Sequence, residues 1–465
     1  MSVLRMTARS IALGTVLYSS VAAGAETLGK VSLSKSTAGH KFSYYRIPSA
    51  KRLAVIINWP ADVSLSPNGR EALSYLAPMH MLMGGAEGQS ASLLKAEFKD
   101  LDAAFNIRTK PSDVSAYFAA PIANAASAAK LANLVIAKPT FGNTWFRRVK
   151  SMMLQRYKQT SSTSMARVAT ASRNYAMGTH PYAQVAPFRS QSTIQRVTHQ
   201  DIVDWYRKVF VHKGIVITAS GPSSREQAGM VIDQLLNGLP AKSPQTHLVP
   251  GPAKLRMDGK TIVLLDQNVK KSTVMISAEL PRTNSLRDLR SILATQILGQ
   301  GVHSKLFKAL RSKLGLAYRV SAQIIPLQSQ STILIVQGEF ETSKLPLAIA
   351  TLKDTIASFA EQGTEAAEFE AARDRYAAQL GRRLKRPMQA SILMMAAHKS
   401  NLPSNVILRT GQFIKQTSLL DMNAHIAGSW PSRDRSLTVV VTPDAANIKA
   451  DCTINSVAEL TQCGG

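Results

Sequence analysis

The chain has 465 residues, of which 45% are hydrophobic, and its formal net charge is +27. A chain of this length exceeds one ordinary hydrophobic core, so we expect two or more domains. The positive charge is not accompanied by a known nucleic-acid module or by aromatic residues interleaved with the basic ones, so we expect no nucleic-acid partner. A surface this basic can instead attract an acidic partner or an anionic membrane surface.

The first 25 residues have the pattern of a cleaved secretory signal peptide. Arg5 and Arg9 precede a mostly apolar run over 11–21, and the small residues at 23–25 fit the cleavage rule. The apolar run is too short to span a bilayer, which disfavours a membrane anchor. We therefore expect an exported, periplasmic protein whose mature chain begins at Glu26.

Strand and helix patterns recur along the chain at an offset of about 220 residues, as expected of an internal duplication. Strands and helices mixed in this order predict an α+β fold with helices on one face of a sheet. In the first half we expect strands at 52–60, 114–121 and 214–220, and helices at 69–83, 90–105, 124–136 and 144–175. In the second half we expect strands at 272–281, 331–340 and 436–443, and helices at 286–298, 304–312, 345–359 and 365–384.

The stretch 238–255 carries four prolines and no aliphatic periodicity, which indicates an extended linker. We therefore expect an N-terminal domain over 26–237, a linker over 238–259, a C-terminal domain over 260–448 and a tail over 449–465. Cys452 and Cys463, both in the tail, are the only cysteines of the chain. In an oxidising compartment they are expected to form a disulfide, which would close a short loop and tether the tail.

The most informative segment is 298–322, which reads LGQGVHSKLFKALRSKLGLAYRVSA. A glycine-containing turn leads into an amphipathic helix, and a second glycine leads into a strand that opens with GLAY. This segment resembles the C-terminal half of the pitrilysin/insulinase-like (inverzincin) zinc peptidases, whose pattern is close to GGGxxSRLFxxLRxxxGLAYxV. The stretch THPYAQVAPFRSQSTIQRVTHQDIVDWYRKVF, at 179–210, also resembles that family.

The resemblance implies two homologous α/β roll domains, each an antiparallel sheet with helices on one face, joined by the linker and facing each other across a cavity. In catalytic members an Arg–Tyr pair in the second domain contacts substrate next to the zinc. Here the matching residues are Arg311 and Tyr318. A guanidinium and a phenol together suit a peptide carbonyl or a carboxylate. An isolated pair at this spacing would be unremarkable, because Arg311 would then be a solvated helix charge and Tyr318 a half-buried aromatic residue of a strand.

The zinc motif of the family, HxxEH on a helix of the first half, is degenerate in this chain. The best alignment places Leu76 and Met79 where the first His and the Glu base should be, and only His80 remains. The distal carboxylate ligand falls near Arg156 or Tyr157, and no Asp or Glu occurs between Val114 and Gln200. A zinc site needs three or four His, Cys, Asp or Glu ligands, so we expect no metal in this chain and read His80 as an ordinary helix residue.

These patterns leave two functions open. The first is a zinc-free, substrate-binding subunit of a periplasmic metallopeptidase heterodimer, not catalytic alone, which supplies Arg311 and Tyr318 to the HxxEH site of a homologous, zinc-bearing partner. Its substrate would be a peptide or an unfolded protein. The second is a non-enzymatic binding or scaffold protein of the bacterial envelope, built on the same fold. An active metallopeptidase is disfavoured because the ligands are missing.

Overall fold

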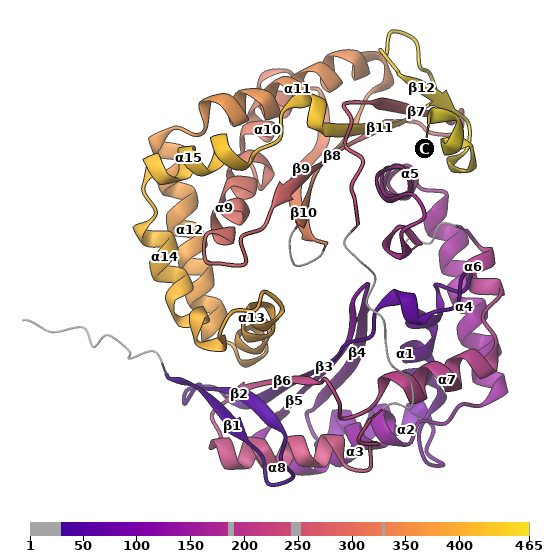
Figure 1. The fold of residues 1–465 in the computed structure, drawn as a ribbon, viewed down its shortest axis with the longest axis vertical. Helices are drawn as coiled ribbons and strands as arrows, with labels where there is room; N and C mark the ends of the chain where they lie inside the picture. Colours follow the sequence, from indigo (N-terminus) through magenta and orange to yellow (C-terminus); the bar gives the residue numbers. More distant parts are fainter. Residues whose placement is uncertain (1–28, 185–189, 243–252, 328–330, 465) are drawn as a thin grey trace, which may run out of the picture.

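A computed structural model describes residues 29–184, 190–242, 253–327 and 331–464, and it consists of two α/β halves that face each other (Figure 1). Each half contains one six-stranded sheet. The sheets lie on the inside of the molecule and most of the helices on the outside, so the predicted fold class is confirmed. Among the described residues, no helix combines the length and the apolar character that a membrane crossing needs.

The first half carries the sheet β1-β2-β6-β3-β5-β4 and its covering helices. Its elements are β1 (Val31–Lys35), β2 (Lys41–Arg46), β3 (Arg52–Trp59), α1 (Leu73–Gly84), α2 (Ala91–Asp100), β4 (Ala104–Lys110), β5 (Asp113–Pro121), α3 (Ala125–Ala137), α4 (Asn143–Ser161), α5 (Ser164–Met177), α6 (Ser192–Gln195), α7 (His199–Val209), β6 (Val216–Gly221) and α8 (Arg225–Leu236).

The second half carries the sheet β12-β7-β11-β8-β10-β9. Its elements are β7 (Thr261–Leu265), β8 (Ser272–Pro281), α9 (Asp288–Gly299), α10 (Lys305–Phe307), a π-helical turn η4 (Lys308–Lys313), β9 (Ala317–Pro326), β10 (Ser331–Phe340), α11 (Leu345–Gln362), α12 (Ala366–Leu384), α13 (Pro387–Lys399), α14 (Thr410–Gln416), α15 (Leu419–Ser429), β11 (Ser436–Thr442), β12 (Cys452–Ile454) and a 3-10 segment η8 (Val457–Cys463).

The two sheets repeat one topology. Strands β2, β6, β3, β5 and β4 pair in the same order and with the same directions as β7, β11, β8, β10 and β9. The sheets are mixed rather than fully antiparallel, because β2–β6, β7–β11 and β7–β12 are parallel pairs. The sixth strand comes from opposite ends of the chain, β1 in the first sheet and β12 in the second. This repeated order agrees with the duplication expected from the sequence.

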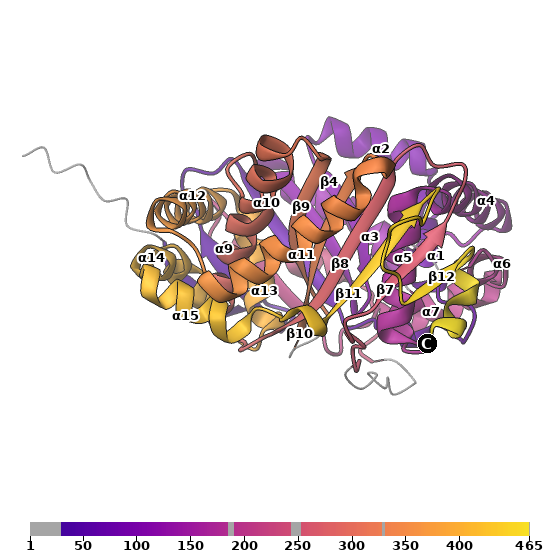
Figure 2. The same ribbon diagram turned by 90° about the horizontal axis from the view of Figure 1, so that it is seen from above.

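Each sheet buries one face under the helices of its own half. In the first half, alternate residues of β3 and β5, such as Val55 and Phe118, pack with α1, α3 and α7. In the second half, Ile276 and Val336 pack with α9, α11 and α12, and Figure 2 shows α11 crossing over the strands. Because successive side chains of a strand point to opposite faces of the sheet, every second residue of these strands faces the helices of its own half.

The inner face of each sheet is partly covered by a helix from the other half. Helix α5 of the first half packs on β8 and β11, and helix α13 of the second half packs on β3 and β6 (Figure 1). Hydroxyl contacts accompany both crossings: Ser172 and Ser277 lie 2.8 Å apart at their Oγ atoms, as do Ser220 and Ser391. The two halves are therefore interlocked, which the sequence did not indicate.

Three local expectations were wrong. The helix expected at 90–105 ends at Asp100, and residues 104–110 form the edge strand β4. The long helix expected at 144–175 is two helices, because Thr163 caps a new helix at Ser164 by accepting a hydrogen bond from the backbone N–H of Ala166. Part of the expected tail is not an appendage, because β12 joins the second sheet.

Candidate functional site

The degenerate zinc motif lies on α1, where its side chains are packed into the core. Leu76 is fully buried in the core of the first half, and Met79 is half-buried against it. His80 is also fully buried. Its ring centroid lies 5.5 Å from that of Phe141, 6.4 Å from Phe146 and 6.2 Å from His199.

The enclosure of His80 keeps its imidazole neutral. Burial, followed by repulsion from His199, lowers its pKa from 6.5 to about 4, and the nearby backbone of Gly142 opposes this shift. Among the described residues, neither ring nitrogen of His80 has a hydrogen-bond partner. The Nε2 atom of His199 forms a hydrogen bond of 2.7 Å with the carbonyl of Phe141, so only its Nδ1 atom could bind a metal.

Helix α4, which would carry the distal ligand, packs against α1 through apolar residues. Val149 and Met153 are buried, Tyr157 is half-buried in the same core, and Arg156 points to solvent. In the described part of the chain, no three His, Cys, Asp or Glu side chains lie close enough together to hold a metal ion. His80 and His199 alone, without a carboxylate or thiolate beside them, do not fit zinc, which needs three or four nitrogen, sulfur or oxygen ligands.

A buried neutral histidine makes stability depend on pH. The pKa of His80 is lower in the folded than in the unfolded protein, so the unfolded state binds more protons between pH 6.5 and 4. We expect the free energy of unfolding to fall by about 2 kcal/mol from pH 7 to pH 5 through this residue. Urea denaturation of the wild type and of His80→Leu measures it; equal pH dependence in both proteins would contradict the assignment.

Arg311 lies on the π-helical turn that follows α10. The turn ends at Gly315, whose φ of 60° is in the left-handed region that favours glycine, and the backbone N–H of Leu316 donates to the carbonyl of Leu310 over 2.7 Å. The Arg311 side chain is exposed, with its guanidinium carbon 5.3 Å from the ring centroid of Phe307. A π-helical turn is often found at functional positions, because it displaces side chains from regular helical spacing.

Tyr318 lies at an irregularity in the edge strand β9. Phe340 of β10 pairs with Ala317 while Glu339 pairs with Arg319, so Tyr318 is the extra residue of a β-bulge. A bulge redirects a side chain relative to the regular alternation, and that of Tyr318 is 69% exposed. The ammonium nitrogen of Lys271 lies 3.4 Å from its ring centroid, an attractive cation–π contact.

The two candidate sites therefore differ in their exposure to solvent. The zinc-motif residues are closed into the core or directed away from one another, whereas Arg311 and Tyr318 are exposed on either side of the turn at Gly315. Sequence reasoning missed the enclosure of His80 and the contact of Lys271 with Tyr318, because the partners are distant in the chain. The expected pairing of Cys452 with Cys463 is present as a disulfide.

Comparison with known proteins agrees with the resemblance seen in the sequence. Residues 196–376 match the family model described as "Peptidase M16 inactive domain". This segment of the chain is therefore similar to a domain of the M16 peptidase family. The matched segment includes both Arg311 and Tyr318, and its description fits a chain whose donor set does not suit zinc.

M16 proteins of known structure have the same fold as this chain. A crystal structure of a peptidase M16 inactive domain from Pseudomonas fluorescens superposes with a TM-score of 0.79 and 20% identity, over 89% of this chain and 98% of that one. The periplasmic protease PqqL from Escherichia coli gives a TM-score of 0.75 and 14% identity, over 95% of this chain but 49% of PqqL. An "Uncharacterized zinc protease" of Rickettsia bellii is 21% identical over 334 residues, 71% of this chain and 78% of the relative.

Proposed function

We propose that this protein is the zinc-free, peptide-binding subunit of a peptidase hetero-oligomer whose partner carries the HxxEH motif and the zinc. The observation that carries the proposal is the contrast between the two sites. His80 is fully enclosed by aromatic neighbours, while Arg311 and Tyr318 remain exposed in their family context. A chain that had lost every peptidase-related role would have no need to keep that pair exposed.

The chemistry available to the exposed pair is binding and charge stabilisation. The guanidinium of Arg311 and the phenol of Tyr318 are hydrogen-bond donors that suit a peptide carbonyl oxygen, or the negative charge that develops on it during hydrolysis. Neither group is a general base that could activate water at neutral pH. The water-activating group must therefore come from another chain, where a zinc ion would lower the pKa of a bound water.

A longer protein of the same fold supports the proposal of a second subunit. The PqqL chain is about twice as long as the region that this protein matches. If two separate chains together formed an assembly of the size of the single PqqL chain, this chain would lie beside a second, homologous chain. The excess of positive charge on this chain would favour an acidic partner or an acidic peptide.

Export to the periplasm remains part of the proposal. The signal-like segment 1–25 lies outside the described residues, and its support is the charge and apolar pattern of the sequence. The comparison protein PqqL is described as periplasmic, and a disulfide such as Cys452–Cys463 persists in oxidising compartments.

The test is to purify the tagged chain from its native cell envelope and to identify co-purifying proteins by mass spectrometry. We expect a homologous chain with an intact HxxEH motif in constant proportion, and peptidase activity in the co-purified material. Arg156→Glu, on an exposed helix outside the proposed peptide contact, is a useful control for binding driven by charge alone. If no such homologue co-purifies, the scaffold function replaces this proposal.

A further inference from the structure

The interlocking helix α5 is fastened to the second half by the C-terminal segment of the chain. Figure 1 places the C-terminus beside α5, and η8 packs against that helix. Leu460 and Cys463 of η8 share a buried cluster with Val168, Ala171 and Tyr175 of α5. Residues of the first half and of the C-terminal segment therefore form one small core on the inner face of the second sheet.

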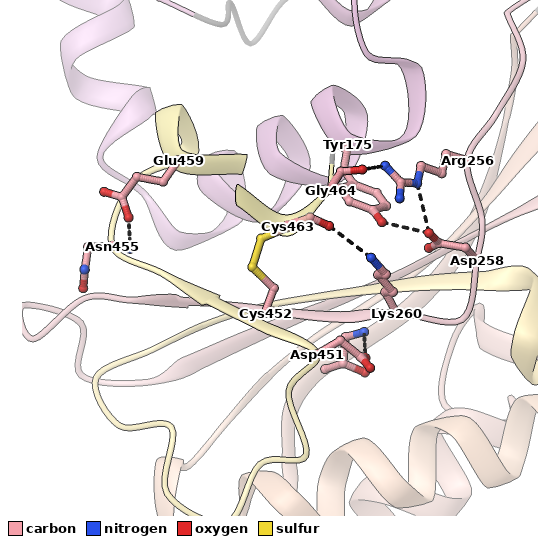
Figure 3. The surroundings of a disulfide bond; sticks show 11 residues. Tyr175, Arg256, Asp258, Lys260, Asp451, Cys452, Asn455, Glu459, Cys463 and Gly464 are labelled. Atoms are coloured by element: carbon pink, nitrogen blue, oxygen red, sulfur yellow. Dashed lines mark hydrogen bonds and ion pairs between the residues drawn. A yellow bond between two sulfur atoms is a disulfide. The ribbon is translucent and has the colours of Figure 1, made fainter. Parts of the chain in front are cut away.

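The segment is closed by the Cys452–Cys463 disulfide, which joins strand β12 to the end of η8 (Figure 3). Strand β12 pairs with β7, so one cysteine is fixed to the edge of the sheet while the other lies over α5. The crosslink spans eleven residues along the chain. A covalent loop of this length restricts how far η8 can move away from the sheet.

Polar contacts around the disulfide connect the same three parts of the molecule. The Lys260 ammonium donates to the carbonyl of Cys463 over 3.0 Å, and Arg256 donates to the carbonyl of Gly464 (Figure 3). The guanidinium carbon of Arg256 also lies 4.5 Å from the ring centroid of Tyr175 on α5. Residues just before β7 thus contact both the tail and the crossing helix.

The hydroxyl of Tyr175 completes this group. It donates to Asp258 over 2.8 Å, and Arg256 pairs with the same carboxylate at 2.9 Å. Burial and the neighbouring Asp258 raise the pKa of Tyr175 to about 12, so the phenol keeps its proton throughout the neutral range. Within this group, the bonds of Lys260 and Arg256 to the carbonyls of Cys463 and Gly464 are the ones that involve the tail held by the disulfide.

The equivalent crossing in the other direction has no covalent fastening. Helix α13 lies on β3 and β6 and is held by non-covalent contacts, among them an ion pair of 2.6 Å between Lys399 and Asp113. The only disulfide of the chain is on the α5 side. The crossing by α5 therefore depends on the oxidation state of a cysteine pair, whereas the crossing by α13 does not.

We propose that the Cys452–Cys463 disulfide is a redox-sensitive lock that holds α5 on the second sheet and so fixes one of the two crossings between the halves. A dithiol reductant opens the lock by thiol–disulfide exchange. Its thiolate attacks the half-exposed Cys452 sulfur and releases the Cys463 thiolate, which takes a proton; the second thiol then displaces Cys452 and forms the reductant's own disulfide. Two electrons and two protons pass to the cysteines.

The expected consequence is local. Reduction leaves η8 attached only through β12 and non-covalent contacts, so α5 loses part of its cover and separates more often from β8 and β11. Helix α13 keeps all of its contacts. The lock would thereby control how firmly the half that carries α1 is held against the half that carries Arg311 and Tyr318, without removing either site.

Hydrogen–deuterium exchange of the full chain with and without a small dithiol tests the lock. We expect amides of α5 and β12 to exchange faster after reduction, by on the order of tenfold, and those of α13 and β6 to be unchanged. The Cys452→Ser/Cys463→Ser variant should resemble the reduced wild type and should not respond to the dithiol. Leu460→Ala, which keeps both cysteines, should accelerate α5 exchange in part.

Two outcomes would overturn the lock. The first is equal protection of α5 in oxidised and reduced wild type. The second is an equal acceleration of α5 and α13, because that would show a general loss of stability. The comparison of oxidised with reduced wild type decides the matter even if the serine variant does not fold.

Discussion

Arg311→Ala and Tyr318→Phe should each reduce kcat/KM of the complex formed by this chain and its zinc-bearing partner. The expected loss is about 1–4 kcal/mol of transition-state stabilisation, comparable to the removal of one oxyanion donor. The effect follows because each change removes a donor to the peptide carbonyl, while the exposed positions of both side chains predict little change in folding or assembly. Steady-state kinetics on the purified complex measure it.

The structure supplies matched controls for these two substitutions. Lys313 lies on the same π-helical turn as Arg311 and is also exposed, so Lys313→Ala removes a positive charge without removing the proposed donor. Tyr318→Phe keeps the ring on which Lys271 rests and removes only the hydroxyl. Full activity in both Arg311→Ala and Tyr318→Phe, with assembly intact, would exclude the donor role.

Lys399→Met should lower the free energy of unfolding by about 3 kcal/mol, because it leaves the carboxylate of Asp113 buried without its cation. Asp113 is 4% exposed and accepts hydrogen bonds from Asn58 and Ser112 in addition to its pair with Lys399. Urea denaturation of the whole chain measures the loss. The double variant Asp113→Asn/Lys399→Met should recover most of it, since no charge is then buried; no recovery would mean that Lys399 acts mainly through packing.

The Asp113–Lys399 pair should also make the free energy of unfolding decrease at acid pH. Burial alone would raise the pKa of Asp113, but the charge of Lys399 and its hydrogen bonds outweigh burial and lower the pKa below its usual value. The contribution of the pair is therefore present above pH 4 and is lost as the pH falls through the lowered pKa. The double variant should lack this component.

The strands of the sheet centres could be predicted because their residues strictly alternate or are buried throughout. The residues 272–281 and 331–340 were expected as strands and form β8 and β10. Strand β4 was missed because only Ile107 of its residues is fully buried, and an edge strand with one covered face gives a weak signal. The break between α4 and α5 depends on one cap, Thr163, within an otherwise helical pattern.

The crossing of α5 and α13 could not be derived from the sequence. An amphipathic pattern shows that a helix buries one face, but it does not say which of two similar sheets receives that face. The candidate site, too, could be predicted only in part from the sequence. Leu76, Met79 and His80 were identified by spacing along one helix, whereas the enclosure of His80 depends on Phe141, Phe146 and His199, which only the tertiary structure brings together.

If this chain binds peptide beside a metal that it does not itself hold, zinc is present in the complex and absent from the isolated chain. The most direct measurement is the zinc content, by atomic emission, of the purified chain and of its purified complex after dialysis. We expect no stoichiometric zinc and no peptide cleavage for the chain alone, and one zinc per complex. One equivalent of zinc bound to the isolated chain and abolished by His80→Leu would contradict it.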